Sequence, residues 1–433
     1  MNGTNAGGHG AGGAPPVVII GAGIAGLAAA ITLHKAGRTV CLLEASDGVG
    51  GRVRSDRTAE GFVLDRGFQV LFTAYPALGG LVDRRALRLR AFDSGALIAG
   101  SAPMQVVIDP FAHPTRLPQL LTNSPFSRAD MLRLLRLKLE LMGPASRRLA
   151  HAAERSTAEE LGHIGFSRSA LDRFITPFFG GVLLDRDLGT RAPWFLFLVK
   201  MLSEGRTVVP GDGMGALATQ LAAHLPAGVI HLDTPAQEIL RDTEGRAIAV
   251  QAKKERFPAT DIILATDPWS ARSLCPALPD LAPLGCTTTY FSSAEPLYRE
   301  RLIVLNPDKA GFLNLVAQLT NVAPSYAPAG QHLLSCTSLV AQHLNDATVE
   351  RRSLAELRQW FGNKVDKLRC LGIYRIGHAQ FSQPPNWRAD RPDPRTSTNG
   401  LYLAGEYLQS SSIQGALRSG VDAARAVIAP RTP

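Results

Sequence analysis

Three glycines near the amino end have the spacing that a dinucleotide-binding turn requires. They lie in the run Gly21-Ala22-Gly23-Ile24-Ala25-Gly26, which has the pattern GxGxxG. In this pattern the first glycine permits a tight turn, the second lets the backbone approach a pyrophosphate, and the third lets a helix pack closely on a strand. Glu44 follows roughly 20 positions later, where a carboxylate can accept hydrogen bonds from a ribose. The spacing therefore predicts a dinucleotide site.

The elements around the turn are those that would hold it in place. Val17–Ile20 is a short β-branched run, typical of a central parallel strand that is buried on both faces. Residues 27–33 are strong helix formers, and the amino end of such a helix offers unpaired N–H groups to a phosphate. Residues 39–43 predict a second strand that ends at Glu44. Because Glu44 suits a free ribose hydroxyl better than a 2′-phosphate, FAD and NAD are both open at this point.

A second glycine cluster separates these two cofactors. Ala45 follows the acidic residue, and then comes Gly50-Gly51-Arg52. A glycine pair lets the backbone approach the diphosphate from its other side, and the guanidinium can neutralise a phosphate or stack on a ring. An NAD-only domain does not need this cluster. The sequence here resembles the flavin-containing amine oxidase and phytoene desaturase superfamily, whose signature is a glycine pair with arginine shortly after the ribose-binding glutamate.

The resemblance extends along most of the chain. Residues 209–217 resemble the family's Pro-x-x-Gly-Met turn. A strand is expected at 231–240, and in it Ala236 stands where the family usually has a valine that contacts the adenine through its backbone. Asp65 falls in the family's Asp-x-Gly segment, for which we expect a structural role. Gly405 and Glu406 match the carboxy-terminal AGE motif, in which the acidic residue holds the ribityl chain.

The last predicted helix would complete the flavin site. Ser412 can cap a helix that runs to about residue 428, and Ile413 and Ala416 lie in its first turn. Its amino end would point at the flavin pyrimidine ring and stabilise negative charge there. No cysteine lies between residues 400 and 416, so we expect FAD to be bound non-covalently.

The order of the motifs predicts an α/β fold with two discontinuous domains. A Rossmann-like FAD-binding domain would comprise residues 15–72, 205–272 and 395–430, after a flexible tail at 1–14. An α+β substrate domain with a mixed sheet and helices would comprise 73–204 and 273–394. We expect its first part to be mainly helical, with a helix at 127–142 and a capping box at 157–160, and its second part to hold strands. Residues 172–181 are rich in phenylalanine and glycine and would line a substrate channel or pack in a core.

The reaction that the resemblance implies is transfer of a hydride from a substrate C–H bond to flavin N5. Many amine oxidases of the superfamily have a lysine on the strand that residues 285–291 should form, and this chain has none there. We therefore favour dehydrogenation of an apolar small molecule, isoprenoid, carotenoid-like or porphyrinogen-like. An amine oxidase that releases hydrogen peroxide and a non-catalytic carrier of the GDP-dissociation-inhibitor type are the alternatives. No catalytic residue is predicted, and for His378 a structural role is the simpler expectation.

Composition and charge exclude several other classes of protein. Of 433 residues, 45% are hydrophobic and 19% charged, which excludes disordered, collagenous and coiled-coil chains. The net charge of +9 permits an anionic partner, but no motif indicates a nucleic acid. Residues 131–139 form a basic amphipathic stretch that could contact anionic lipid, or could turn its leucines to the core and its arginines to water. The five cysteines lie far apart, which predicts neither a metal site nor disulfides and favours the cytoplasm. We expect no secretory signal and no transmembrane helix, and no feature indicates an oligomeric state.

Overall fold

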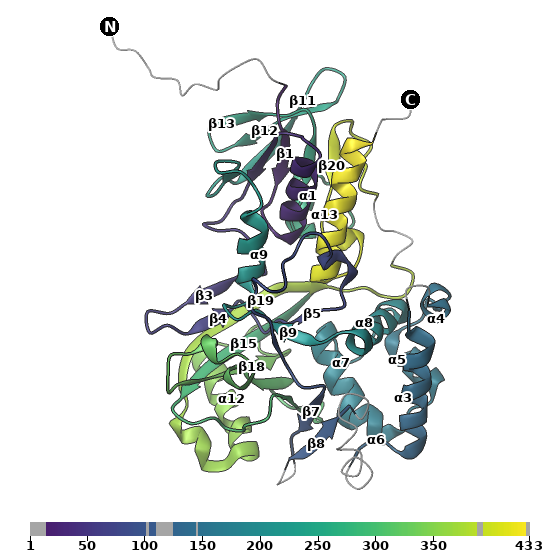
Figure 1. Ribbon diagram of the computed structural model, residues 1–433, viewed down its shortest axis with the longest axis vertical. Helices are drawn as coiled ribbons and strands as arrows, with labels where there is room; N and C mark the ends of the chain where they lie inside the picture. The colour runs from purple at the N-terminus through teal and green to yellow at the C-terminus, as the bar shows by residue number, and fades with distance from the viewer. Residues whose placement is uncertain (1–13, 101–103, 110–123, 144–145, 388–392, 430–433) are drawn as a thin grey trace.

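The computed structural model describes residues 14–100, 104–109, 124–143, 146–387 and 393–429, so all but the last residue of the predicted tail at 1–14 lies outside the described residues. Two bodies of structure stand one above the other in Figure 1. The upper body holds both the first and the last helices of the chain. The lower body consists of a large sheet beside a group of helices.

The centre of the upper body is a five-stranded parallel sheet. Its order is β10-β2-β1-β14-β20, so the first strand of the chain lies in the middle. Its strands come from all three segments that the motif order predicts for one domain. They are β1 (Val17–Ile20), β2 (Val40–Leu43), β10 (Ile230–His231), β14 (Ile262–Leu264) and β20 (Leu401–Leu403).

Both faces of this sheet are covered, because alternate side chains of each strand enter different apolar clusters. Val17 and Ile19 pack with helices α1 (Ile24–Lys35) and α13 (Ile413–Ile428). Val18 and Ile20 pack instead against an antiparallel sheet of three strands. These strands are β11 (Ala236–Arg241), β12 (Ala247–Ala252) and β13 (Glu255–Pro258). Burial on both sides explains why β1 is apolar at every position.

The lower body is organised by a seven-stranded mixed sheet with the order β19-β15-β18-β17-β16-β7-β8. All its neighbours are antiparallel except β16 and β7. The strands are β7 (Gly95–Ile98), β8 (Gln105–Ile108), β15 (Pro283–Ser293), β16 (Ile303–Leu305), β17 (Leu315–Gln318), β18 (His332–Ser338) and β19 (Arg369–Phe381). Five of them, β15 to β19, lie in the segment 273–394, where the sequence predicts strands.

Helices cover this sheet unequally. One face packs on α12 (Asp346–Phe361) through Val349 and Leu357. A separate group of helices stands beside the sheet at the lower right of Figure 1. It comprises α3 (Arg128–Leu141), α4 (Arg147–Ala150), α5 (Thr157–Ile164), α6 (Arg168–Ala170), α7 (Thr176–Leu183) and α8 (Ala192–Glu204), with a π-helical turn at Leu171–Ile175. Within the described ranges, no helix combines the length and the apolar character needed to cross a membrane.

Smaller elements join the two bodies. A three-stranded sheet has the order β5-β9-β6, and a hairpin pairs β3 with β4. The bounds are β3 (Ser55–Arg57), β4 (Val63–Asp65), β5 (Leu71–Phe72), β6 (Arg90–Ala91) and β9 (Thr207–Val209), with helices α9 (Gly215–Ala222), α10 (Pro268–Leu274) and α11 (Leu319–Val322).

Two local predictions are wrong, and one is incomplete. The stretch 73–204 is mainly helical, with α3 to α8 in it, but it also holds β7 and β8, which complete the lower sheet. The strand expected at 231–240 is two strands in two sheets, since Asp233 has a φ of 50° and turns the chain before Pro235. The capping box of α5 begins at Ser156, not at residue 157, with Glu159 as its reciprocal partner.

Candidate cofactor and substrate site

One large cavity lies where the two bodies meet. Its volume is about 1070 Å³, and its lining comes from the glycine turn, from α13 and from the helices of the lower body. Of the residues predicted to hold a cofactor, all but Ala22 and Gly26 line it. The predicted residues in the lining are Gly21, Gly23, Ile24, Ala25, Glu44, Ala45, Gly50, Gly51, Arg52, Ala236, Gly405, Glu406, Ile413 and Ala416. Residues from four widely separated segments therefore meet at one cavity.

The turn before α1 leaves an open space at Gly23. A Cβ built on Gly23 would have no atom within 4 Å, and the residue has an ordinary φ of −70°. Nothing in the protein itself therefore requires glycine here. The first turn of α1 also has no side-chain cap and no acidic residue. An anionic group that approaches this helix end would account for both features, since it needs the space and would accept from the free N–H groups.

The other two glycines of the turn are required by the fold. Gly21 has a φ of +102°, and a Cβ there would lie 2.9 Å from the carbonyl oxygen of Ala265. A Cβ on Gly26 would lie 1.9 Å from the carbonyl oxygen of Gly21. These two glycines fix the path of the chain, whereas Gly23 leaves room.

Glu44 lies at the carboxyl end of β2 and is held in place by its neighbours. Its Oε2 accepts from the Ala22 N–H at 2.8 Å, and its Oε1 accepts from the Ser46 N–H and hydroxyl at 3.0 and 2.7 Å. The side chain is only 9% exposed, and it lines the cavity. These hydrogen bonds fix the carboxylate where a ribose hydroxyl could donate to it.

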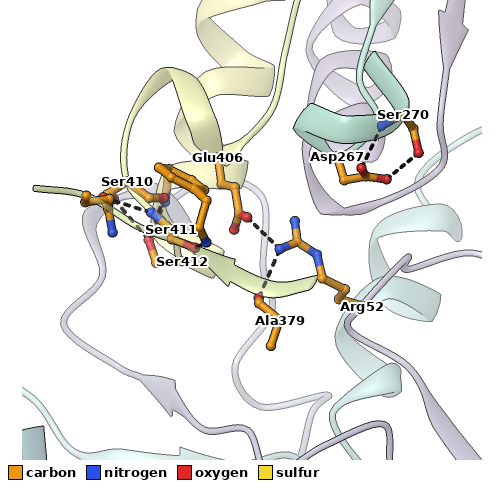
Figure 2. A network of polar contacts seen from close by, with 11 residues as sticks. Arg52, Asp267, Ser270, Ala379, Glu406, Ser410, Ser411 and Ser412 are labelled. Atoms are coloured by element: carbon orange, nitrogen blue, oxygen red, sulfur yellow. Dashed lines mark hydrogen bonds and ion pairs between the residues drawn. The ribbon is translucent and has the colours of Figure 1, made fainter. Parts of the chain in front are cut away.

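Arg52 and Glu406 form an ion pair across the cavity wall (Figure 2). The Arg52 guanidinium donates to Glu406 Oε1 at 2.5 Å and to the carbonyl oxygen of Ala379 at 3.0 Å. Burial raises the pKa of Glu406, and the adjacent guanidinium opposes this rise. The pair joins the second glycine cluster, the carboxy-terminal motif and strand β19. Sequence reasoning considered each residue separately and missed this contact.

The amino end of α13 is built as predicted. Ser412 is the N-cap, and its hydroxyl accepts from the Gly415 N–H at 2.9 Å. Ile413 and Ala416 in the first turn line the cavity. The helix therefore presents its positive end to the cavity, near the Arg52–Glu406 pair.

The part of the cavity farther from the glycine turn has aromatic walls. A continuous series of phenylalanines lines it, with successive ring centroids between 4.7 and 5.8 Å apart. In order of contact they are Phe126, Phe174, Phe178, Phe179 and Phe195. The aromatic run at 172–181 thus lines the cavity, and so do Trp194 and Phe195. We call this part the aromatic chamber.

His378 also lines the cavity. Its ring stacks on Trp269 with centroids 4.2 Å apart and planes 18° apart. Asp267 and Ser270, at the start of α10, lie in the lining as well, and the Asp267 carboxylate accepts from the Ser270 N–H (Figure 2). Stacking fixes the imidazole plane, which is consistent with a structural role.

Asp65 is a buried carboxylate that does not line the cavity. It accepts from the Ser55 hydroxyl at 2.5 Å, from the Met214 N–H at 2.8 Å and from the Tyr326 hydroxyl at 3.0 Å. Burial raises its pKa to about 6, although these three donors oppose the rise. Asp65 connects the hairpin β3–β4, the turn before α9 and the lower body, which fits the structural role expected for it.

The fold and cavity define a class of nucleotide-binding oxidoreductases in which a parallel sheet carries the cofactor turn beside an apolar chamber. The sequence model of the flavin-containing amine oxidoreductase family matches residues 24–428, so the chain belongs to that family. It is therefore a flavin-dependent oxidoreductase. The predictions of family, α/β fold class and enzyme class are confirmed.

Individual proteins agree with this assignment. Hydroxysqualene dehydroxylase of Rhodopseudomonas palustris is 27% identical over 95% of this chain and 98% of its own length. Protoporphyrinogen oxidase 2 of Arabidopsis thaliana is 29% identical, but the match covers 38% of this chain and 32% of that protein. A putative protoporphyrinogen oxidase structure from Exiguobacterium sp. 255-15 has a TM-score of 0.74 at 17% identity, covering 96% of this chain and 99% of that one, and shows the shared fold.

Within the part of the chain that the structure describes, no group of three or more histidine, cysteine or acidic side chains could hold a metal ion.

Proposed function

We propose that the cavity binds FAD without a covalent bond and that the enzyme dehydrogenates an apolar small molecule in the aromatic chamber. The observation that carries the proposal is the continuity of the cavity between the open space at Gly23 and the phenylalanine walls. Its volume of about 1070 Å³ is slightly above the ~300–1,000 Å³ usual for ligand sites, as expected where two ligands meet.

The residues present suit FAD. The space at Gly23 and the uncapped amino end of α1 suit the diphosphate, and Glu44 suits the adenosine ribose. Pro235 and Ala236 line the cavity where the adenine would lie. At the other end, Glu406 and the first turn of α13 would face the ribityl chain and the flavin ring. When bound, the isoalloxazine supplies a hydride acceptor at N5.

The chain's own residues would orient the substrate and exclude water. The phenylalanines of α7 and α8 offer flat apolar surfaces that hold an elongated hydrocarbon against the ring system. The positive end of α13 and the guanidinium of Arg52 would stabilise negative charge that develops at the pyrimidine side of the cofactor. Dehydrogenation also releases a proton from the atom next to the carbon that loses the hydride. We assign the acceptor of that proton to no side chain of the chamber, and we assign no catalytic residue.

The lining of the chamber favours a neutral substrate over a protonated amine. The only charged side chain that α3, α7 and α8 contribute to the lining is Lys138, a cation, and it pairs with Asp109 at 2.5 Å. The carboxylates Asp93 and Asp109 line the cavity from outside these helices, and Asp109 is already paired with Lys138. An ammonium group that lies against α3, α7 and α8 would therefore meet no carboxylate of these helices. A neutral isoprenoid or carotenoid-like molecule would gain from the same walls. Such a molecule partitions into lipid, so peripheral contact with a membrane is part of the proposal.

Anaerobic mixing tests the proposal. FAD-loaded enzyme is mixed with carotenoid precursors, porphyrinogens and amines, and loss of flavin absorbance near 450 nm is followed. We expect rapid bleaching by one apolar class and none by amines. Bleaching by an amine, with hydrogen peroxide released in air, would instead establish an amine oxidase. A purified protein that takes up no FAD would contradict the cofactor assignment and favour a carrier.

A further inference from the structure

The helix α3 carries large apolar side chains on two opposite faces. Its inner face lines the aromatic chamber and includes Met131, Leu134 and Leu137. Its outer face is formed by residues three or four positions apart, which lie on one side of a helix. We define the outer face of α3 as Leu132, Leu135, Leu139 and Met142, the C-cap residue.

The outer face is exposed. Leu132 is 67% exposed, Leu139 61% and Met142 59%, and Leu135 lines a shallow groove with Leu132 and Leu139. In an ordinary amphipathic helix the leucines pack into the core. In α3 only two of the leucines, Leu137 and Leu141, are buried. The other exposed large apolar residues of the described chain occur singly, on four separate segments. They are Val106, Leu232, Val340 and Ile428. A grouped apolar surface of this kind marks an interaction site.

The surroundings of the outer face are basic. Between residues 128 and 148 the chain has six cations and two acids, a net charge of +4 out of +9 for the whole chain. Of the two acids, Asp130 is fully buried, and its carboxylate accepts from Ser127 and Ser167. Glu140 is shared between Arg136 and Arg148. The side chain of Arg136 is itself 82% exposed, on the same side as the leucines.

We propose that the outer face of α3 docks on an anionic lipid bilayer. Leu132, Leu139 and Met142 would enter the acyl region, and Arg128 and Arg136 would meet the headgroups, as in other basic amphipathic helices that lie on membranes. A second copy of the chain is a poorer partner for this face. In a two-fold dimer the same patch meets itself, so the exposed Arg128 and Arg136 of one copy would oppose the same arginines of the other.

The docking surface gives the chamber a source of substrate. Because the inner face of α3 lines the chamber, only this one helix separates the outer face from the cavity. An apolar molecule could then pass from lipid to cavity beside α3 without crossing bulk water. This consequence rests on the proposed function, whereas the docking itself does not.

Sedimentation with vesicles tests the docking. Full-length holoenzyme is mixed with sucrose-loaded vesicles of phosphatidylcholine containing 30% phosphatidylglycerol, and with vesicles of phosphatidylcholine alone. We expect wild type to bind the anionic vesicles. The double variant Leu132→Ser/Leu139→Ser should bind them at least tenfold more weakly, and Arg128→Gln/Arg136→Gln should lose only the preference for anionic lipid. Val340→Ser removes a side chain that is 59% exposed elsewhere and should bind like wild type.

The controls keep the result interpretable. Melting temperature and FAD content of each variant are measured first, and both should match wild type because the replaced side chains are exposed. Equal vesicle binding by wild type and the double leucine variant would overturn the proposal. The proposal would also be overturned if light scattering showed that the wild type is a dimer and the double leucine variant a monomer. The outer face of α3 would then bind a second copy of the chain.

Substrate assays separate this proposal from the proposed function. Vesicle binding without oxidation of any apolar compound leaves the docking intact and removes the proposed substrate class. Oxidation of a detergent-dispersed apolar substrate by an enzyme that binds no vesicles would support the proposed function and rule out the docking. If both proposals hold, the double leucine variant should oxidise vesicle-borne substrate at least tenfold more slowly and detergent-dispersed substrate at the wild-type rate.

Discussion

Replacing Gly23 with alanine separates cofactor binding from folding. A Cβ at this position has no neighbour within 4 Å, and the backbone angles of −70° and 178° are open to alanine. If the FAD diphosphate lies in this space, the added methyl group must displace it from the first N–H groups of α1. The variant should therefore fold and fail to hold the cofactor.

Two opposing effects of the alanine act on the free energy of unfolding. Alanine restricts the unfolded chain more than glycine does, which stabilises the fold by about 0.4–1 kcal/mol. Alanine is also a poorer N-cap than glycine, which costs about as much. The free energy of unfolding of the apoprotein should therefore change by less than about 1 kcal/mol. Loss of one hydrogen bond to a charged phosphate costs about 1.5–3 kcal/mol, or roughly 10- to 150-fold in the Kd for FAD.

Two other glycines supply the controls. Gly162 lies in α5, and a Cβ there also meets nothing within 4 Å, so Gly162→Ala should leave FAD affinity unchanged. Gly26→Ala should damage the apoprotein itself, because its Cβ would lie 1.9 Å from a carbonyl oxygen. Apoprotein stability is measured by urea unfolding and FAD affinity by calorimetric titration. Wild-type affinity in Gly23→Ala would refute the placement of the diphosphate. Loss of more than about 2 kcal/mol from its apoprotein would refute our account of the turn.

Three further substitutions test other parts of the structure. Glu406→Gln removes the anion that Arg52 contacts and leaves a half-buried guanidinium with the Ala379 carbonyl alone. The free energy of unfolding of the apoprotein, measured in urea at pH 7, should therefore fall by about 1–3 kcal/mol. An unchanged free energy would show that the ion pair adds nothing to stability. The native pKa of Asp65 is about 6 against an ordinary value of 3.8, so the native state holds this proton more tightly and its stability falls as pH rises through that interval. Between pH 4.5 and 7.5 the difference in unfolding free energy between Asp65→Asn and wild type should shift by roughly 2 kcal/mol in favour of the variant, and a pH-independent difference would contradict the raised pKa. Phe178→Ala removes the ring that stacks on Phe174 with centroids 5.8 Å apart. The variant should have a kcat/KM for the apolar substrate about tenfold lower and an unchanged FAD content. Loss of FAD instead would place Phe178 at the cofactor.

Features whose signal is local in the sequence were predictable. The turn at 21–26, strand β2 ending at Glu44 and the Ser412 cap each depend on neighbours within a few residues or on one βαβ unit. The long strands β15 and β18 of the lower sheet were recognisable because each contains a run of apolar or β-branched residues long enough to be distinguished.

Features that depend on distant partners were not predictable. Strand β7 has four residues, and its parallel neighbour β16 comes some 200 positions later, so the short run alone does not distinguish it from a loop. The contact between Arg52 and Glu406 joins motifs at opposite ends of the chain. The exposure of Leu132 and Leu139 was not predictable for a different reason. Leucines on both sides of α3 have the same helical spacing, and only packing decides which side is covered.

The crossing of α1 and α13 sets conditions on how the protein is made. A Cβ at Gly420 would lie 2.1 Å from the carbonyl oxygen of Ala25, so the first and last helices touch backbone to backbone. During synthesis, the side of α1 that packs on α13 has no cover until α13 has left the ribosome. The nascent chain must therefore keep that surface from aggregating through most of translation, which makes a chaperone that holds the amino-terminal segment valuable. Messages truncated before residue 413 should yield insoluble product even though they encode the whole glycine turn.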